Sequence, residues 1–251
     1  MISLIPVSGI PEVRPGDDLA SLIADGLAAA GIGLADDDVL VVTQKVVSKA
    51  EGRVVDLRTV EPRPEAVAWA ERWGKDARQV ELVLRESADV VRWADGGLII
   101  SRTPHGFVCA NAGVDLSNTG GSELATLLPV DSDASARALR ERLGELTGVR
   151  PPVVISDSFG RPWRSGIVNV AIGAAGLDAL VDLRGQPDAQ GREMRSTIIA
   201  VADELASAAD LAGGKVGQLP VVIVRGYAAA GSHADRGAAE LVMPREQDLF
   251  P

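Results

Sequence analysis

Residues 39–45, Val-Leu-Val-Val-Thr-Gln-Lys, place four aliphatic side chains directly before three polar ones. A short, mostly β-branched run is typical of a buried strand, so Thr43, Gln44 and Lys45 are predicted to lie at the end of that strand. The same order recurs in residues 153–158, where Val-Val-Ile precedes Ser-Asp-Ser. The two stretches therefore predict a sheet whose buried strands end in polar groups that could carry chemistry.

The rest of the chain alternates between helical and strand patterns. Apolar residues recur at helical spacing at 19–27 after Asp17 or Asp18, at 65–73, at 76–86, through Leu146 after Ser132 or Asp133, and in the longest pattern at about 194–211. Strands are predicted at 2–5, 107–110 and 221–224, and a hairpin is predicted to join 90–91 to 98–100. Since helices and strands interleave without a repeat or a low-complexity linker, we predict an α+β fold with mixed sheets and interleaved helices.

The composition argues against several classes of protein. The 251 residues suffice for one large domain or two closely joined ones, and no stretch approaches the ~20 apolar residues of a membrane span. The first residues lack the basic start and long apolar run of a signal peptide, so we expect a cytoplasmic protein. A net charge of -10 and an aromatic content of 3% argue against a nucleic-acid surface.

Residues 111–118, Asn-Ala-Gly-Val-Asp-Leu-Ser-Asn, are too polar for a simple buried strand, and we interpret them as a ligand loop. Asp115 in this loop and Asp157 in the second polar group have serine hydroxyls nearby. Such hard oxygen donors suit Mg²⁺ or Mn²⁺ better than zinc. The alternative is turn chemistry, because Asp, Asn and Ser often satisfy nearby backbone amides. The residues alone leave both interpretations open.

Cationic side chains could bind an anionic ligand. Lys45 and Lys49, four residues apart, could both meet phosphate, although lysines are most often simply solvated. The planar fork of arginine suits carboxylate and phosphate. Several arginines lie beside or close to glycines, namely Arg161, Arg164, Arg184, Arg192 and Arg225. Surface placement is the default for each, but their number in an acidic chain favours a local anion site.

Two further patterns narrow the choice of chemistry. The single cysteine, Cys109, cannot form an internal disulfide, which agrees with a reducing compartment. It lies in the predicted strand 107–110, where cysteine is usually an inert hydrophobe, so no thiol nucleophile is predicted. The glycine-rich phosphate loops of P-loop and Rossmann proteins do not occur, and any nucleotide site must therefore be built differently.

Five segments followed by a sixth, in this order and spread over nearly the whole chain, together resemble the coenzyme F420-0:L-glutamate ligase family. They are VSGIP at 7–11, TQKVVSKAEGR at 43–53, NAGVDLSN at 111–118, SDSFGR at 156–161, DLRGQPDAQGR at 182–192 and PVVIVRG at 220–226. Members occur as standalone enzymes or as the N-terminal domain of a two-domain bacterial form, and residues 247–251 resemble the join. The resemblance implies that 1–251 is one ligase domain of two closely joined subdomains, acting as a homodimer.

Enzymes of this family use GTP as co-substrate and a divalent metal to couple L-glutamate to the deazaflavin precursor coenzyme F420-0. The resemblance implies Mg²⁺ or Mn²⁺, with K⁺ as a further candidate cation, and no catalytic residue beyond the metal ligands. The implied metal ligands are Asp115, Asp157 and Ser158. The implied nucleotide contacts are Ile10, Pro11, Gln44, Lys45, Lys49, Asn118 and Gly214. We assign the precursor to Arg161, Arg164 and Arg192.

The resemblance also suggests a reaction. GTP would phosphorylate the terminal carboxylate of the precursor, and the amine of glutamate would attack the resulting acyl phosphate. Some family members carry a glutamate ligand for a second metal where this chain has Lys215. Two other functions stay open: a metal-dependent nucleotide phosphohydrolase that uses the same aspartates to activate water, and a module that binds nucleotide or deazaflavin without catalysis.

Overall fold

Residues 39–43 and 153–156 lie on two strands that pair with each other in parallel. A computed structural model describes residues 1–117, 123–214, 217–227 and 236–248. In it, β2 (Val39–Thr43) lies beside β8 (Val153–Arg161), with Leu40 opposite Val153 and Thr43 opposite Ser156. Because the strands are parallel and in this register, their polar residues follow the buried ones in the same direction along the sheet.

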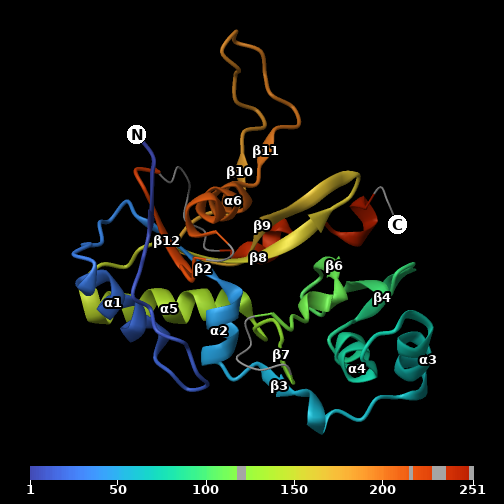
Figure 1. Ribbon diagram of the computed structural model, residues 1–251. Coiled ribbons are helices and arrows are strands. Elements are labelled where there is room, and N and C mark those ends of the chain that lie inside the picture. Colours follow the sequence, from blue (N-terminus) through green and yellow to red (C-terminus); the bar gives the residue numbers. More distant parts are fainter. Residues whose placement is uncertain (118–122, 215–216, 228–235, 249–251) are drawn as a thin grey trace.

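Three antiparallel neighbours complete the main sheet, whose order is β1-β12-β2-β8-β9. β12 (Val221–Arg225) pairs with β2 on one side and with β1 (Ser3–Pro6) on the other, while β9 (Arg164–Ala175) forms a long hairpin with β8. The mixed sheet and the helices between its strands confirm the predicted α+β fold (Figure 1).

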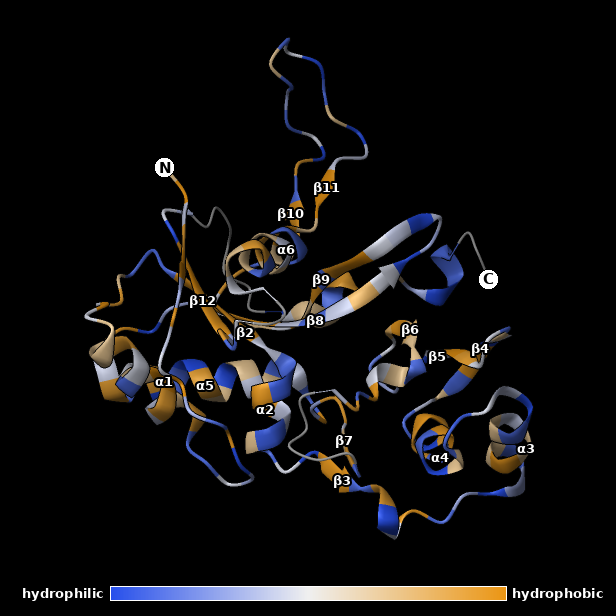
Figure 2. Cartoon of the chain, viewed as in Figure 1, coloured by the Kyte–Doolittle hydropathy of each residue, from blue (hydrophilic) through white to orange (hydrophobic). Residues whose placement is uncertain are grey.

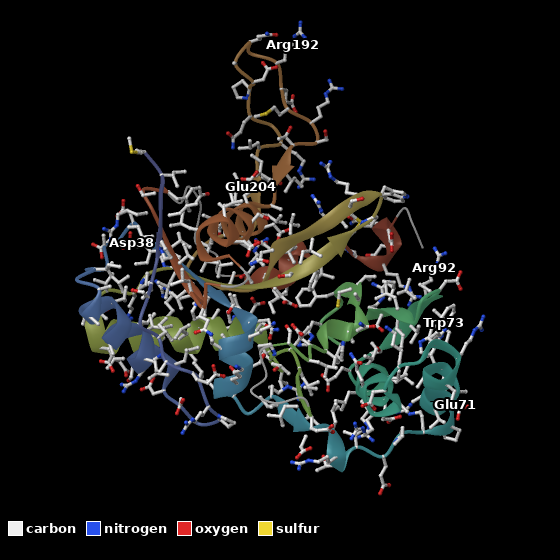
Figure 3. All side chains as sticks on the ribbon, viewed as in Figure 1. Asp38, Glu71, Trp73, Arg92, Arg192 and Glu204 are labelled. Carbon is white, nitrogen blue, oxygen red and sulfur yellow. The ribbon has the colours of Figure 1, made fainter. Side chains whose placement is uncertain are left out.

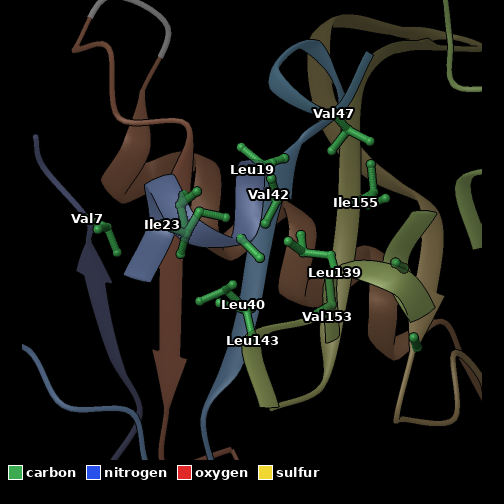
Figure 4. Close-up of a cluster of buried hydrophobic side chains, with 14 of the residues drawn as sticks. Val7, Leu19, Ile23, Leu40, Val42, Val47, Leu139, Leu143, Val153 and Ile155 are labelled. Carbon is green, nitrogen blue, oxygen red and sulfur yellow. The ribbon is translucent and has the colours of Figure 1, made fainter. Parts of the chain in front are cut away.

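Helices cover both faces of this sheet. On one face α1 (Leu19–Ala29) and α5 (Ser132–Thr147) bury Ile23 and Leu143 against Leu40, Val42 and other strand residues (Figure 4). On the other face α6 (Val201–Gly213) buries a row of alanines and leucines against alternate strand residues. The alternation follows from the two-residue period of a strand, and it makes β2 and β8 hydrophobic on both sides.

A smaller part of the chain has its own core. α3 (Pro64–Trp73) and α4 (Ala77–Arg85) pack on a three-stranded sheet of β4 (Asp89–Ala94), β5 (Leu98–Arg102) and β6 (Val108–Ala110). β4 and β5 are the hairpin predicted from the sequence. Two short strands, β3 (Val54–Asp56) and β7 (Leu124–Thr126), pair with each other where the chain enters and leaves this part.

The remaining elements are short. α2 (Gln44–Ala50) directly follows β2, and four single 3-10 turns are η1 (Leu57–Thr59), η2 (Asn111–Gly113), η3 (Ala238–Leu241) and η4 (Arg245–Gln247). β10 (Val181–Asp182) and β11 (Ile198–Ile199) form the base of an arm that extends away from the sheet. Most of this arm is hydrophilic, in contrast to the hydrophobic β12 (Figure 2). In the part of the chain that the structure describes, the helices lack the length and apolar character needed to cross a bilayer.

Three sequence predictions of element bounds were wrong. The helix expected from about 194 starts at Val201, because Ile198 and Ile199 pair with β10 as the end of the arm. The cap of α5 is Asp131, whose carboxylate accepts from the N–H of Ala134, rather than Ser132 or Asp133. Residues 156–158 do not follow a strand but continue β8, since β9 pairs with them throughout.

Leu143→Ala should destabilise the protein by about 2–5 kcal/mol, because Leu143 is fully buried between α5 and the sheet. Leu146, one turn further along the same helix, is 41% exposed, and Leu146→Ala should change the free energy of unfolding by much less. Urea unfolding followed by circular dichroism measures both. Equal losses for the two variants would contradict the packing of α5.

Candidate functional site

Lys45 joins two of the polar groups that the sequence singles out. Thr43 ends β2 and α2 begins at the next residue, so Lys45 lies in the first turn of the helix. Its Nζ is 2.7 Å from Asp115 Oδ2 and donates to Ser117 Oγ at 2.7 Å. Residues far apart in sequence therefore meet beside the main sheet, as the ligand-loop interpretation requires.

The environment of Asp115 keeps its carboxylate charged. Burial alone would raise the pKa of Asp115, but hydrogen bonds from Lys45 and Ser117 outweigh burial and hold the pKa below its usual range. One of these bonds is a turn contact, in which the Ser117 N–H donates to Asp115 Oδ1 at 2.7 Å. One oxygen of Asp115 thus accepts a hydrogen bond within the turn, and the other forms an ion pair with Lys45.

The backbone around Asp115 is tightly constrained. Asp115 and Thr126 exchange two backbone hydrogen bonds across an isolated bridge, at 3.0 and 2.8 Å. Just before it, Asn111 and Ala112 both have a φ of +52°, which few residues other than glycine adopt. A left-handed turn next to a bridge fixes the direction in which the Asp115 side chain leaves the chain.

Asp157 lies on the same face of β8 as the α1 and α5 layer. Strand alternation groups Asp157 with Ile155 and Phe159, both of which contact the core on that face. Burial, and secondarily the charge of Asp157, raises the pKa of Cys109 on β6 to about 12. Cys109 therefore stays a thiol at neutral pH. Because β6 leads through η2 to Asp115, both predicted aspartates lie on segments next to β6.

Ser158 faces the opposite side of β8, toward α6. There its hydroxyl donates to Oδ1 of Asn169, directly opposite on β9, at 2.7 Å. A small pocket of about 20 Å³ opens beside this pair, with room for about one water molecule. Its polar lining comes from Thr43, Ser156, Asn169 and Asp210. The predicted metal ligands Asp157 and Ser158, although adjacent in sequence, thus point to different faces of the sheet.

The other predicted nucleotide residues are placed around α2 and the end of α6. Lys49 is only 7% exposed and pairs with Glu12 Oε1 at 2.5 Å, which brings α2 next to the segment containing Ile10 and Pro11. Gln44 is fully buried; its Oε1 accepts from Ser48, and its Nε2 finds no partner among the described residues. Gly214 lines the pocket on the α6 side. Asn118 and Lys215 lie outside the described residues.

The structure separates the three arginines assigned to the precursor. Arg161 and Arg164 lie together at the tip of the β8–β9 hairpin, beside Trp163, which is 79% exposed. Arg192 lies at the far end of the arm beyond β10 and β11 (Figure 3), and this arm extends in a different direction from the β8–β9 hairpin (Figure 1).

Arg184 and Arg225, two further arginines beside glycines, form ion pairs with aspartates. Arg225 forms two bonds of 2.7 Å with the buried Asp38, and Arg184 pairs with Asp182 at the base of the arm. Neither is therefore part of the candidate site.

Three polar residues near the site were missed by sequence reasoning: Glu12, Asn169 and Asp210. Ser117, by contrast, lies inside the ligand loop and was recognised as its hydroxyl. Asn169 interrupts the run Ile-Val-Asn-Val-Ala-Ile at 167–172, and a buried polar residue in such a run is a usable signal. Glu12 and Asp210 had no distinguishing pattern, because their roles depend on contacts with distant segments.

The side chains that could bind a metal ion at this site are few and carry oxygen donors. Within the described ranges, no group of three or more His, Cys, Asp or Glu side chains could hold a metal ion. Mg²⁺, however, is commonly bound by one or two carboxylates and completes its shell with water and substrate phosphates. The carboxylate of Asp115 already contacts one positive charge, the ammonium of Lys45. The carboxylates of Asp115 and Asp157, both on segments next to β6, therefore suit Mg²⁺ or Mn²⁺ held jointly with a phosphate, whereas Ser158 lies on the other face of β8.

A protein-family model and several individual proteins are similar to this chain. The family model described as F420-0:Gamma-glutamyl ligase matches residues 9–226. The coenzyme F420:L-glutamate ligase of Methanothermobacter thermautotrophicus is 47% identical over 250 residues, which cover 99% of this chain and 98% of the relative. The protein of the same name from Methanopyrus kandleri is 50% identical over 222 residues, covering 88% and 85% of the two chains. Since the family model spans most of the sequence and the relatives match nearly end to end, the chain belongs to the F420-0:gamma-glutamyl ligase family.

Proposed function

We propose that this protein is a GTP- and metal-dependent ligase that adds L-glutamate to coenzyme F420-0 through an acyl phosphate. The names of its relatives supply the substrates, glutamate and the deazaflavin coenzyme. The observation that carries the proposal is the ion pair of Lys45 with Asp115 beside the parallel strands β2 and β8. This ion pair places an ammonium that could bind phosphate, that of Lys45, next to a carboxylate that could bind a metal ion, that of Asp115.

The proposed reaction has two steps. A carboxylate oxygen of the precursor attacks the γ-phosphorus of GTP, and the bond to the β-phosphate oxygen breaks, which releases GDP. The amine of glutamate then attacks the carbonyl carbon of the acyl phosphate, loses a proton and expels inorganic phosphate. Both steps depend on placing the reactants and neutralising charge, and neither needs a protein nucleophile.

The residues of the site have distinct proposed roles. Mg²⁺ or Mn²⁺, held by Asp115 and Asp157, would supply charge neutralisation at the phosphates. Lys45 would leave Asp115 and donate to a phosphate oxygen when nucleotide and metal bind, since all of these charges compete for the same contacts. Ser158 and Gly214 would contact the ligands from the α6 side. Lys49, paired with Glu12, would lie at the start of the nucleotide site.

The precursor and a second copy of the chain belong to the same proposal. Arg161 and Arg164, together at the hairpin tip, would bind acidic groups of the precursor. Arg192 lies at the far end of the arm, and we assign its contact with the precursor to a homodimer in which the arm reaches the second copy. K⁺ as a further cation stays a proposal that rests on the resemblance alone.

Incubation with coenzyme F420-0, L-glutamate, GTP and Mn²⁺ should increase the mass of the coenzyme by whole glutamate units, with GDP and phosphate formed in equal amounts. Mass spectrometry of the product provides the measurement. GTP hydrolysis that proceeds equally well without glutamate and precursor would instead support a phosphohydrolase. Tight binding without any product would support a binding module.

Asp157→Asn should lower the rate of glutamate addition by at least about 100-fold, because the neutral amide cannot balance the charge of the metal. The variant should melt close to the wild-type temperature, since the substitution preserves shape. Asp25→Asn, the same change on the exposed side of α1, serves as the matched control. A fully active Asp157→Asn enzyme would refute the assignment of Asp157 to the metal.

A further inference from the structure

Asn169 is a buried residue of β9 to which no role has been assigned so far. It is 6% exposed and lies directly opposite Ser158. Ser158 Oγ donates to Asn169 Oδ1 at 2.7 Å. A hydroxyl has a single proton, and here that proton points to Asn169. Any other group that contacts this oxygen must approach its lone pairs, which is how a cation binds a hydroxyl.

Asn169 is itself held in place by α6. Its backbone carbonyl accepts from Ser207 Oγ at 2.7 Å, and two residues further along β9 the Ala171 N–H donates to Asp203 Oδ1 at 2.8 Å. Asp203 and Ser207 are four residues apart and therefore lie on one side of α6. Helix α6 thus holds β9 by two hydrogen bonds, one to the backbone of Asn169 and one from that of Ala171.

These two hydrogen bonds lie where the pairing of β8 with β9 is irregular. Ile155 is opposite Gly173 and Ser156 is opposite Ala171, so Ile172 has no opposite residue on β8. Such a bulge shifts every later pair of the hairpin and re-aims the side chains. The bonds from α6 fix β9 just beyond this shift, at the residues that face Ser156 and Ser158.

We propose that Asn169 is a positioning residue: by accepting the proton of Ser158 it turns the lone pairs of that hydroxyl toward a divalent cation bound with the nucleotide on the α6 side of β8, separate from the cation assigned to Asp115 and Asp157 on the opposite face. Asp203 and Ser207 keep Asn169 in register for this contact. The inference rests on the proposed function, because it gives Ser158 a cation to bind. It adds a residue that acts through Ser158 and does not itself touch the cation.

A double-mutant cycle in Mn²⁺ binding tests this relation directly. Binding is measured in the presence of GDP from the electron paramagnetic resonance signal of free Mn²⁺, for the wild type, Ser158→Ala, Asn169→Ala and the double variant. We expect Asn169→Ala to weaken Mn²⁺ binding about tenfold, as losses of groups that orient metal ligands usually do. In the Ser158→Ala background the same change should have no further effect. Additive losses, or unchanged binding by Asn169→Ala, would overturn the proposal.

Asn169→Asp provides a second variant that keeps the acceptor oxygen. It should restore Mn²⁺ binding to at least the wild-type level while Asn169→Ala does not, and the KM for glutamate should be unchanged in both. If Asn169→Ala does not fold, Ser207→Ala replaces it in the cycle, because it loosens the same strand from α6. A loss of binding with Asn169→Asp equal to that with alanine would contradict the positioning role.

The outcome for the wild type separates this inference from the proposed function. Wild-type protein that forms glutamyl product but shows additive losses leaves the ligase proposal standing and refutes the role of Asn169. Non-additive losses in a protein that binds Mn²⁺ but forms no product support the role of Asn169 and refute the ligase. A wild type that does not bind Mn²⁺ with GDP refutes both.

Discussion

The parallel pairing of β2 with β8 is the constraint on which the rest of the structure depends. Backbone hydrogen bonds hold Leu40 to Thr43 against Val153 to Ser156, with helices packed on both faces of the pair. Parallel strands of this kind need burial on both sides, which α1 and α5 supply on one face and α6 on the other. A slip of the pairing by one residue would exchange the side chains of the two faces and dismantle both cores together.

The same register determines how the polar residues are distributed. Beyond Ile155, β8 continues as a hairpin with β9, so its side chains keep alternating after the hydrophobic run ends. The Asp157 side chain therefore lies on the face of β8 near β6, η2 and Asp115. The Ser158 side chain lies on the other face, near α6 and Asn169. A ligand that contacted both would have to reach around the edge of the sheet, as a nucleotide with its phosphates and metal is large enough to do. The two-sided arrangement thus follows from strand geometry alone.

Much of this could be predicted from the sequence, and the failures have physical causes. The runs at 39–42 and 153–155 identified the central strands, because continuous aliphatic stretches need burial on both faces. β9 was missed because Asn169 interrupts its hydrophobic run at 167–172 and because its last residues are small; Gly173, for example, lies against Ser132 with no room for a Cβ. The start of α6 was misplaced because Ile198 continues the helical spacing backwards into β11.

The site was less predictable than the fold. Polar residues with suitable chemistry were recognised, but the contact of Lys45 with Asp115 joins segments that only the tertiary structure brings together. The sequence also could not show how Asp115 is used: one of its oxygens accepts from the Ser117 N–H in a turn, and the other pairs with the distant Lys45. Asn169 and Asp203 act across elements whose packing no local pattern specifies.

The central claim is that β8 and the loop after η2 bring Asp157 and Asp115 to one cation. The anomalous scattering of manganese in crystals grown with Mn²⁺ and GDP would test it. The account predicts a peak within about 2.0–2.6 Å of carboxylate oxygens of Asp115 and Asp157, with Lys45 moved from Asp115 to a phosphate. A manganese peak that lies away from both aspartates, with the ion pair of Lys45 and Asp115 intact, would contradict it.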